Sequence, residues 1–260
     1  MDKHRSHIHI RDYNLHKGLA EIFTPDRHRA THLAEKVIRF SRFRGEELGR
    51  LQKLAIHRFH EDAVFDIRSE TIDVPDEAVM TAYFQFFDEL FFFGSLGGSR
   101  RFLLNVDFSR SEDQEPPFVF SQRPVLNVQD GIQSQIYELL IVRQRGETRY
   151  DRLRAALSLL LQGMCHAFLK LWQCKWDQCD EMWSEQGTGR AWQDMALAIE
   201  DATYDRQFLN LNMSLERLKT LAGALKVNPA KLKKEQLRKW RFEPKRLERE
   251  LAIYTDKRKA

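Results

Sequence analysis

The stretch from Tyr150 to Trp172 constrains the fold of this 260-residue chain more than any other. Its apolar residues recur at intervals of three and four, at Leu153, Ala156, Leu157, Leu160, Leu161, Met164, Phe168 and Leu171. This i, i+3, i+4, i+7 spacing is kept over several turns and places the apolar residues on one face of an α-helix. The sequence therefore predicts one long amphipathic helix here.

Shorter patterns on either side of this helix predict the other elements. Helical periodicity and capping residues predict helices at residues 29–43, 46–59, 76–93, 190–204, 215–225 and from Asn228–Pro229 through Trp240. Short apolar runs between clusters of Pro, Gly and Asp predict strands at residues 102–108, 118–120, 126–128 and 136–142. Helices before and after a run of strands are typical of the α+β class.

Composition favours a soluble globular protein. Hydrophobic residues make up 42% of the chain and charged residues 31%, which suits a domain with a substantial core plus flanking arms. The polar N-terminus has no apolar signal segment, and apolar runs such as Leu157 to Leu161 are too short to span a bilayer. Three cysteines, an odd number, indicate a reducing compartment. We therefore expect an intracellular protein with no membrane segment.

Charge divides the chain into three parts. Residues 1–68 carry 14 Lys and Arg against 10 Asp and Glu, a net charge of +4, and eight of the nine histidines. Residues 69–212 carry 13 against 22, a net of −9, and residues 213–260 carry 15 against 6, a net of +9. We interpret the His-rich beginning as solvated basic helices. The basic end is suited to nucleic acid, an anionic membrane face or the acidic middle of its own chain.

Within the predicted long helix, residues 162–166 match the frame of a zinc-protease motif but lack most of its functional groups. An H-E-x-x-H motif places two His side chains one helical turn apart, where both bind one Zn²⁺, and its Glu takes a proton from zinc-bound water. Here the final ligand is present as His166. Gln162 stands in the first ligand position, and Gly163 stands in the position of the general base.

This helix resembles the catalytic helix of the SprT-like family, in the fungal style that reads HEMCHAF. The family's third ligand lies in a downstream GHGxAW loop, which is similar to GTGRAW at residues 187–192, except that Thr188 replaces the His. The FFFGSL segment, the predicted strand at 136–142 and the cysteines Cys174 and Cys179 also resemble the family.

The resemblance covers residues 76–204 and implies a zincin-like fold within the α+β class. Together with the charge pattern, it divides the chain into three expected parts: a basic, His-rich helical extension at 1–68, a SprT-like domain at 69–205, and a basic helical tail at 206–260. These boundaries follow the changes in charge along the chain closely.

Carried over position by position, the resemblance implies an inactive site with vestigial positions Gln162, Gly163, His166 and Thr188. A neutral amide is a poor zinc ligand, and loss of a general base alone costs about 10²–10⁴ in rate. We therefore expect no catalytic residue, no metal and no cofactor. The alternative is a zinc site rebuilt from His166, Cys174 and Cys179. A further hypothesis is that Gly163 lets a neighbouring element approach the helix closely.

The basic tail is a candidate nucleic-acid surface, because aromatic residues interleave with its cations. The candidates are Lys231, Lys233, Lys234, Arg238, Lys239, Trp240, Arg241, Lys245 and Arg246. The SprT-like family includes DNA-dependent proteases, so the resemblance makes DNA a candidate partner, beside an unidentified protein partner, and the nucleus a candidate compartment of an intracellular protein. The alternative interpretation is a solvated helical face that packs its few apolar residues on the domain.

The leading functional hypothesis is a catalytically inactive SprT-like protein that acts by binding, at DNA or chromatin. Two alternatives stay open. One is an active zinc metalloprotease with a non-standard metal site, and the other is a plain protein-interaction scaffold.

Overall fold

The computed structural model describes residues 7–10, 22–69, 74–111, 118–126, 133–175, 189–227, 229 and 232–256. Its helices are α2 (Ala30–Ser41), α3 (Arg50–Glu61), α4 (Asp76–Phe91), α5 (Arg149–Trp172), α6 (Arg190–Tyr204), α7 (Arg217–Val227), α8 (Lys234–Lys239) and α9 (Pro244–Asp256), with short 3-10 turns η2 (Gly45–Glu47) and η3 (Ala63–Phe65). The strands are β1 (Phe102–Ser111), β2 (Phe118–Leu126) and β3 (Gln133–Arg143). The predicted mixture of helices with a small sheet is confirmed.

The three strands form one mixed sheet in the order β1-β3-β2. The central strand β3 runs parallel to β1 and antiparallel to β2. In this register, Leu139 of β3 lies between Leu104 of β1 and Phe120 of β2. Leu139 therefore stands in the middle of the sheet, a position that matters for the site described below.

Strand β2 corrects one prediction. It is a single strand that runs without a break to Leu126, so the prediction of separate strands at 118–120 and 126–128 is wrong. Pro124, which separates the two predicted strands, lies within the observed strand. A proline is tolerated there because β2 is an edge strand, where one row of backbone N–H groups needs no partner in the sheet.

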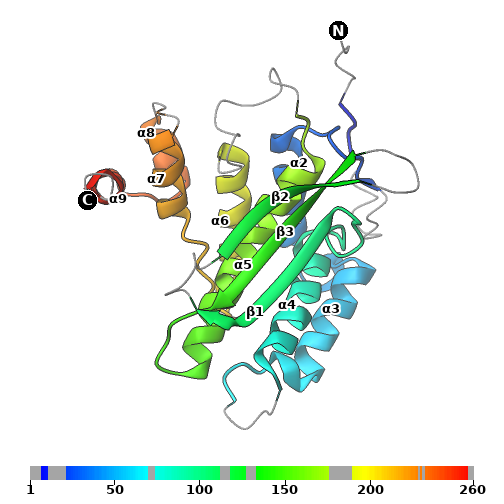
Figure 1. The fold of residues 1–260 in the computed structure, drawn as a ribbon. Coiled ribbons are helices and arrows are strands. Elements are labelled where there is room, and N and C mark those ends of the chain that lie inside the picture. Colours follow the sequence, from blue (N-terminus) through cyan, green and yellow to red (C-terminus); the bar gives the residue numbers. More distant parts are fainter. Residues whose placement is uncertain are drawn as a thin grey trace.

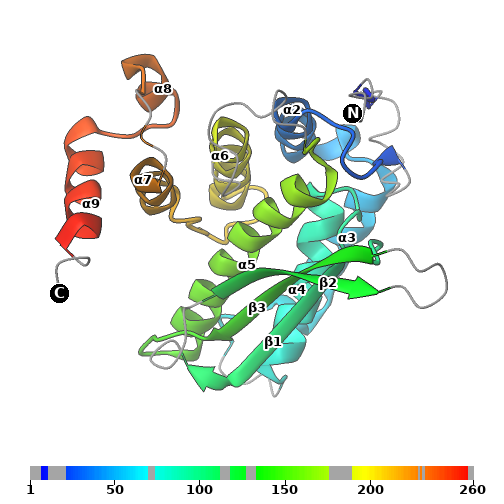
Figure 2. The same cartoon turned by 45° about the horizontal axis from the view of Figure 1, so that its top comes forward.

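The helices of the domain pack in two layers on one side of the sheet. Helix α5 lies against β3 and β2, and α4 lies beside it against β1 (Figure 1). Behind them, α3 packs on α4, and α2 packs along α6 (Figure 2). Helices α7, α8 and α9 extend beyond α6, away from the sheet (Figure 2). Helix α5 is therefore the element that contacts both the sheet and the second helical layer.

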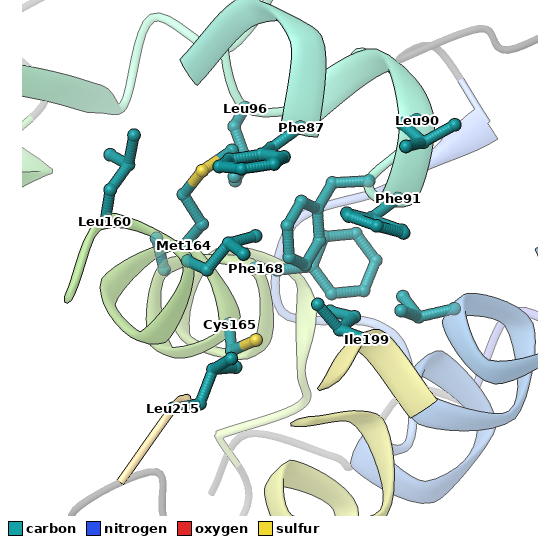
Figure 3. Packing of buried hydrophobic residues seen from close by; sticks show 14 of the residues in the cluster. Phe87, Leu90, Phe91, Leu96, Leu160, Met164, Cys165, Phe168, Ile199 and Leu215 are labelled. Atoms are coloured by element: carbon teal, nitrogen blue, oxygen red, sulfur yellow. The ribbon is translucent and has the colours of Figure 1, made fainter. Parts of the chain in front are cut away.

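Helix α5 forms the centre of the hydrophobic core. Met164 and Phe168 point from it toward Phe87 and the other aromatic residues of α4 (Figure 3). Cys165 points the opposite way, toward Leu215 (Figure 3). These five side chains have no more than 1% of their surface exposed. The long apolar face predicted from the sequence is therefore the face that the other elements cover.

By length and composition alone, α5 is apolar enough to cross a membrane. The expectation of no membrane segment came from the short uninterrupted apolar runs, whereas the apolar character of α5 is an average over a longer window. However, 78% of the most apolar window of the helix is buried inside the protein. Its apolar surface is already covered by α4, α6 and the sheet, which is typical of a core helix in a globular domain.

The His-rich extension is helical, as predicted, through α2 and α3, and it packs into the main core. Leu33 and Val37 of α2 are fully buried. His28 pairs with the end of α5: its N–H donates to the Trp172 carbonyl at 3.2 Å, and its own carbonyl accepts the Cys174 N–H at 2.7 Å. His28 is also fully buried, so the interpretation of this segment as solvated is wrong at that residue.

The tail forms a small hydrophobic cluster separate from the main core. Its buried members are Leu221, Ala222, Leu225, Leu237, Trp240 and Leu247, from α7, α8 and α9. We call residues 217–256 the tail unit. The helix predicted at 215–225 is observed as α7. The helix predicted from Asn228 is observed only as the short α8, and α9 was not predicted, although Pro244 suits a first helical position.

Candidate functional site

The frame of the motif is assembled between α5 and α6. Gln162 and His166 lie one turn apart on α5, and both are largely buried. The His166 ring stacks on Trp192 of α6, with ring centroids 5.1 Å apart and an interplanar angle of 25°. Phe120 of β2 lies on another side of the imidazole, at 6.4 Å between centroids. Two sequence segments with family resemblance, around 162–166 and at Trp192, therefore meet in space.

Helix α6 begins where the loop resemblance predicts. Gly189 is its N-cap, and the Gly189 carbonyl accepts the Gln193 N–H at 3.0 Å. Trp192 therefore sits in the first turn and is fully buried. Thr188, the expected replacement for the third ligand, lies outside the described residues, as does Cys179.

The position of the general base is filled by another side chain. A Cβ atom placed on Gly163 would lie 2.6 Å from Leu139 Cδ2 and closer still to Cδ1. Contacts of that length do not occur between carbon atoms in well-packed proteins, whose optimum is about 3.5–4.0 Å. The hypothesis that Gly163 permits close approach of a neighbouring element is confirmed, and that element is the central strand β3.

The first ligand position faces the tail. The Gln162 side-chain amide donates from Nε2 to Thr220 Oγ1 at 3.0 Å. Thr220 in turn donates its hydroxyl to the carbonyl of Glu216, the residue before α7, at 3.0 Å. Gln162 therefore links α5 to the tail unit. Sequence reasoning did not identify Thr220, because no pattern in the chain connects two residues 58 positions apart.

The described residues at the motif positions do not fit a zinc site. They provide one imidazole, one amide whose nitrogen is bonded to Thr220, and no side chain at Gly163. Structural or catalytic zinc takes at least three protein ligands of the His, Cys or carboxylate type. In the part of the chain that the structure describes, no group of three such side chains is gathered closely enough to hold a metal ion.

The alternative zinc site would require His166, Cys174 and Cys179 to lie close together. Cys174 lies two residues beyond Trp172, where α5 ends. His166 lies six residues before Trp172, which is about 9 Å along the helix. Two donors of one zinc ion are about 4 Å apart, given bond lengths of about 2.0 and 2.3 Å. The His166 ring is directed at Trp192, whereas Cys174 is bonded through its backbone to His28. Cys179, the third residue of this alternative, lies outside the described residues, so the rebuilt zinc site stays a prediction.

Cys165, next to the motif histidine, is part of the core. It is fully buried between α5 and α6. Burial, and then the nearby Glu200 carboxylate, raise the pKa of the Cys165 thiol well above its usual range. The thiol therefore stays protonated and behaves as a small apolar side chain.

Three residues of the predicted nucleic-acid surface face α6 instead. Trp240 is only 2% exposed, and its indole Nε1 donates to Asp194 Oδ1 at 2.7 Å. The Lys239 ammonium contacts the same carboxylate at 2.7 Å. Arg241 binds Asp201 through two parallel hydrogen bonds of 2.6 and 3.0 Å. The prediction that Trp240 stacks on nucleic-acid bases is therefore wrong for this conformation, because its ring is in the tail core.

The other described cations of the predicted surface are exposed. They are Lys233, Lys234, Arg238, Lys245 and Arg246, and none of them forms an ion pair with a carboxylate in the described part of the chain. Arg249 of α9 is also exposed, and the prediction omitted it. Lys231 lies outside the described residues.

Helices α8 and α9 are joined by four residues, 240–243. Arg241, inside this turn, has a φ of +59°, and the Phe242 N–H donates back to the Leu237 carbonyl at 2.8 Å. The two helices thus form a helix-turn-helix arrangement on α7. It places Lys245 and Arg246 in the first turn of the longer helix.

No family model matches this chain, and no curated protein or solved structure matches it either. Proposals about its function therefore depend on the geometry described above.

Proposed function

We propose that this protein is a SprT-like protein without protease activity, which acts by binding. One observation carries the proposal: the side chain of Leu139 occupies the space that a general base at residue 163 would need. The first ligand position supports it, because Gln162 is engaged with Thr220. An HExxH-type protease needs both groups at one metal ion.

Restoring the motif tests this proposal. The variant Gln162→His/Gly163→Glu/Thr188→His returns the ligands and the base that the resemblance requires, yet Leu139 still occupies the space of the new Glu side chain. We expect this variant to be less stable than wild type and to hold less zinc than the same variant carrying Leu139→Ala, which frees that space. Zinc per chain, by elemental analysis, and thermal unfolding measure the two effects.

The wild-type protein supplies the complementary test. We expect purified protein to contain no stoichiometric zinc and to leave an unfolded protein substrate intact. About one zinc per chain, lost in either His166→Ala or Cys174→Ser, would overturn the proposal and favour a non-standard zinc site.

The proposed ligand is nucleic acid, bound by the exposed cations of α8 and α9. Five exposed Lys and Arg side chains of the predicted surface form no ion pair within the described residues, so they are available to phosphates. The helix-turn-helix arrangement supports duplex DNA, because such units place the first turn of the second helix at the major groove. Here that turn carries Lys245 and Arg246. A DNA-bound role would place the protein in the nucleus.

Salt dependence tests the nucleic-acid proposal. We expect affinity for duplex DNA to fall as NaCl rises, and Lys233→Ala/Arg238→Ala to reduce the log–log slope by about 2, near one for each lost phosphate contact. The matched control is Arg42→Ala/Arg50→Ala, which removes the same charge from exposed positions at α2 and α3 and should leave the slope unchanged. If wild type does not bind DNA even at low salt, a protein-interaction scaffold becomes the better interpretation.

A further inference from the structure

The tail unit rests on a row of acidic side chains along α6. Asp194 and Asp201 are seven residues apart, two helical turns, and therefore lie on the same side of the helix. Each holds one exposed cation of the tail: Asp194 contacts Lys239, and Asp201 contacts Arg241. Trp240, between these two cations, donates its indole N–H to Asp194. Figure 2 shows α7 lying between α6 and α9, with α8 at one end of the unit.

This contact differs from the packing inside either unit. The main core and the tail cluster are separate groups of buried apolar residues. Between them run mainly polar contacts, such as Gln162 to Thr220 and the Gln193 amide to the Arg217 carbonyl at 3.2 Å. Polar interfaces of this kind between parts of one chain commonly permit relative motion.

The ion pairs along α6 fall into two kinds. The Arg217–Glu200 pair, at 2.5 Å, is enclosed, with side chains 8% and 12% exposed. The cations of the other two pairs are open to solvent, since the Lys239 and Arg241 side chains are 62% and 66% exposed. An external polyanion can therefore reach Lys239 and Arg241 without first breaking the enclosed pair.

We propose that the carboxylates of Asp194 and Asp201 act as an internal competitor of nucleic acid for Lys239 and Arg241. In the docked state these two exposed cations are paired with carboxylates of α6, whereas the outer cations of α8 and α9 form no ion pair within the described residues. When phosphates replace the two carboxylates, the tail unit loosens from α6 and the full basic surface is engaged. This inference rests on the proposed function, because it assumes that the tail binds nucleic acid.

The direct test is the affinity of the variant Asp194→Asn/Asp201→Asn for a 20-base-pair duplex DNA. Asparagine keeps a side-chain oxygen that can accept the Trp240 N–H, so the tail core is retained. We expect binding about 3- to 10-fold tighter than wild type at 0.1 M NaCl, in line with the weakness of exposed ion pairs. The control Glu47→Gln/Glu61→Gln makes the same change in net charge at exposed positions far along the chain, and its affinity should change less than 2-fold.

The outcomes separate the two proposals. If wild type and the Asn variant bind the duplex equally, or if the Gln control tightens binding as much, the internal competitor is overturned while nucleic-acid binding stands. If neither wild type nor the Asn variant binds at low salt, the proposed function itself is overturned.

Hydrogen exchange of the full chain gives a readout that needs no DNA. We expect amides of α8 and α9 to exchange faster at 0.5 M than at 0.05 M NaCl in wild type, and to exchange fast at both concentrations in the Asn variant. Exchange that is the same in both proteins at both salt concentrations would overturn the inference.

Discussion

Gly163 of α5 and Gly223 of α7 both lie in the interior of a helix, but the two regions around them are packed differently. At Gly163 an added Cβ would overlap the side chain of Leu139, whereas at Gly223 it would meet nothing within 4 Å. The body of the domain is thus closed by apolar packing at Gly163. The tail unit has a smaller core and touches the body through hydrogen bonds and ion pairs.

The two regions of this chain therefore differ in how their contacts are made. In the body, Gly163 is packed so tightly against Leu139 that a larger side chain has no room there. In the tail, two of the ion pairs with α6 have exposed cations, Lys239 and Arg241, which other ions can reach. We therefore assign the proposed binding function to the tail. The body holds the tail unit in place, and the carboxylates of α6 compete with nucleic acid for two of its cations.

The largest expected effect tests whether the two regions are separate. Trp240→Ala removes the largest side chain of the tail cluster and should cost about 3–5 kcal/mol there. We expect hydrogen exchange to speed up in α7 and α9, while the amides of α5 stay protected. The control Trp240→Phe keeps most of the apolar area and should cost about 1 kcal/mol, from the lost bond to Asp194. Loss of protection in α5 as well would show that the regions unfold together.

The next effect concerns the packing of Gly163. Gly163→Ala should lower the free energy of unfolding by about 1–3 kcal/mol through overpacking against Leu139, despite the better helix propensity of Ala. In a Leu139→Ala background the same substitution should become neutral or stabilising, because the obstacle is gone. Denaturant unfolding of the four proteins in this double-mutant cycle measures the coupling. A rise in melting temperature for Gly163→Ala alone would exclude close packing at this position.

A smaller effect of opposite sign is expected in the tail. Gly223→Ala should stabilise the tail unit by about 0.5–1 kcal/mol, since the added methyl group meets open space and Ala is the better helix former. Hydrogen exchange in α7 reports the gain. A destabilisation similar to that of Gly163→Ala would mean that the tail is packed as tightly as the body.

The smallest expected effect is a pH dependence of stability that arises in the body and not in the tail unit. His28 Nε2 accepts the Thr24 N–H at 3.0 Å, and Nδ1 lies 2.8 Å from the Ile8 carbonyl, to which it donates. Burial lowers the pKa of His28 below its ordinary 6.5, although the bond to Ile8 opposes this. The unfolded chain then binds more protons below about pH 6.5, so this contribution to stability is present above that pH and is lost as the pH falls.

The measurement is the difference in unfolding free energy between pH 7.5 and 5.5. We expect the loss at pH 5.5 to be smaller in His28→Gln than in wild type. The exposed His57 provides the control, and His57→Gln should keep the wild-type dependence. The exchange rates of the tail unit should not follow this change.

Much of the fold was predictable from local patterns. Helix α6 runs over residues 190–204 as expected, and α5 begins one residue before its expected start. Both have a wide apolar face, which gives a strong periodic signal. The prediction failed at β2, where it stopped before Pro124, and at α9, which was not predicted although it begins at Pro244. A proline is tolerated in an edge strand of a sheet and at the first position of a helix, whereas it disrupts a central strand or the interior of a helix.

The candidate site was only half predictable. The absence of a base at Gly163 and of a ligand at Gln162 can be read directly from the chain. What replaced them cannot, because Leu139 and Thr220 come from distant segments with no shared pattern. The acidic middle of the chain was named as one partner of the basic tail, and three tail cations do meet α6. Which three they are depends on the turn at 240–243.

By itself, the sequence determined the helices with strong periodicity, the α+β class, the charge of each part and the groups missing from the motif. These properties depend on residue type and short spacing, which a linear chain already contains. Only the tertiary structure decided that Leu139 fills the place beside Gly163 and that Trp240 is buried against Asp194. Such contacts depend on the register of β3 under α5 and on where the tail docks, and both are set by the packing of segments far apart in the chain.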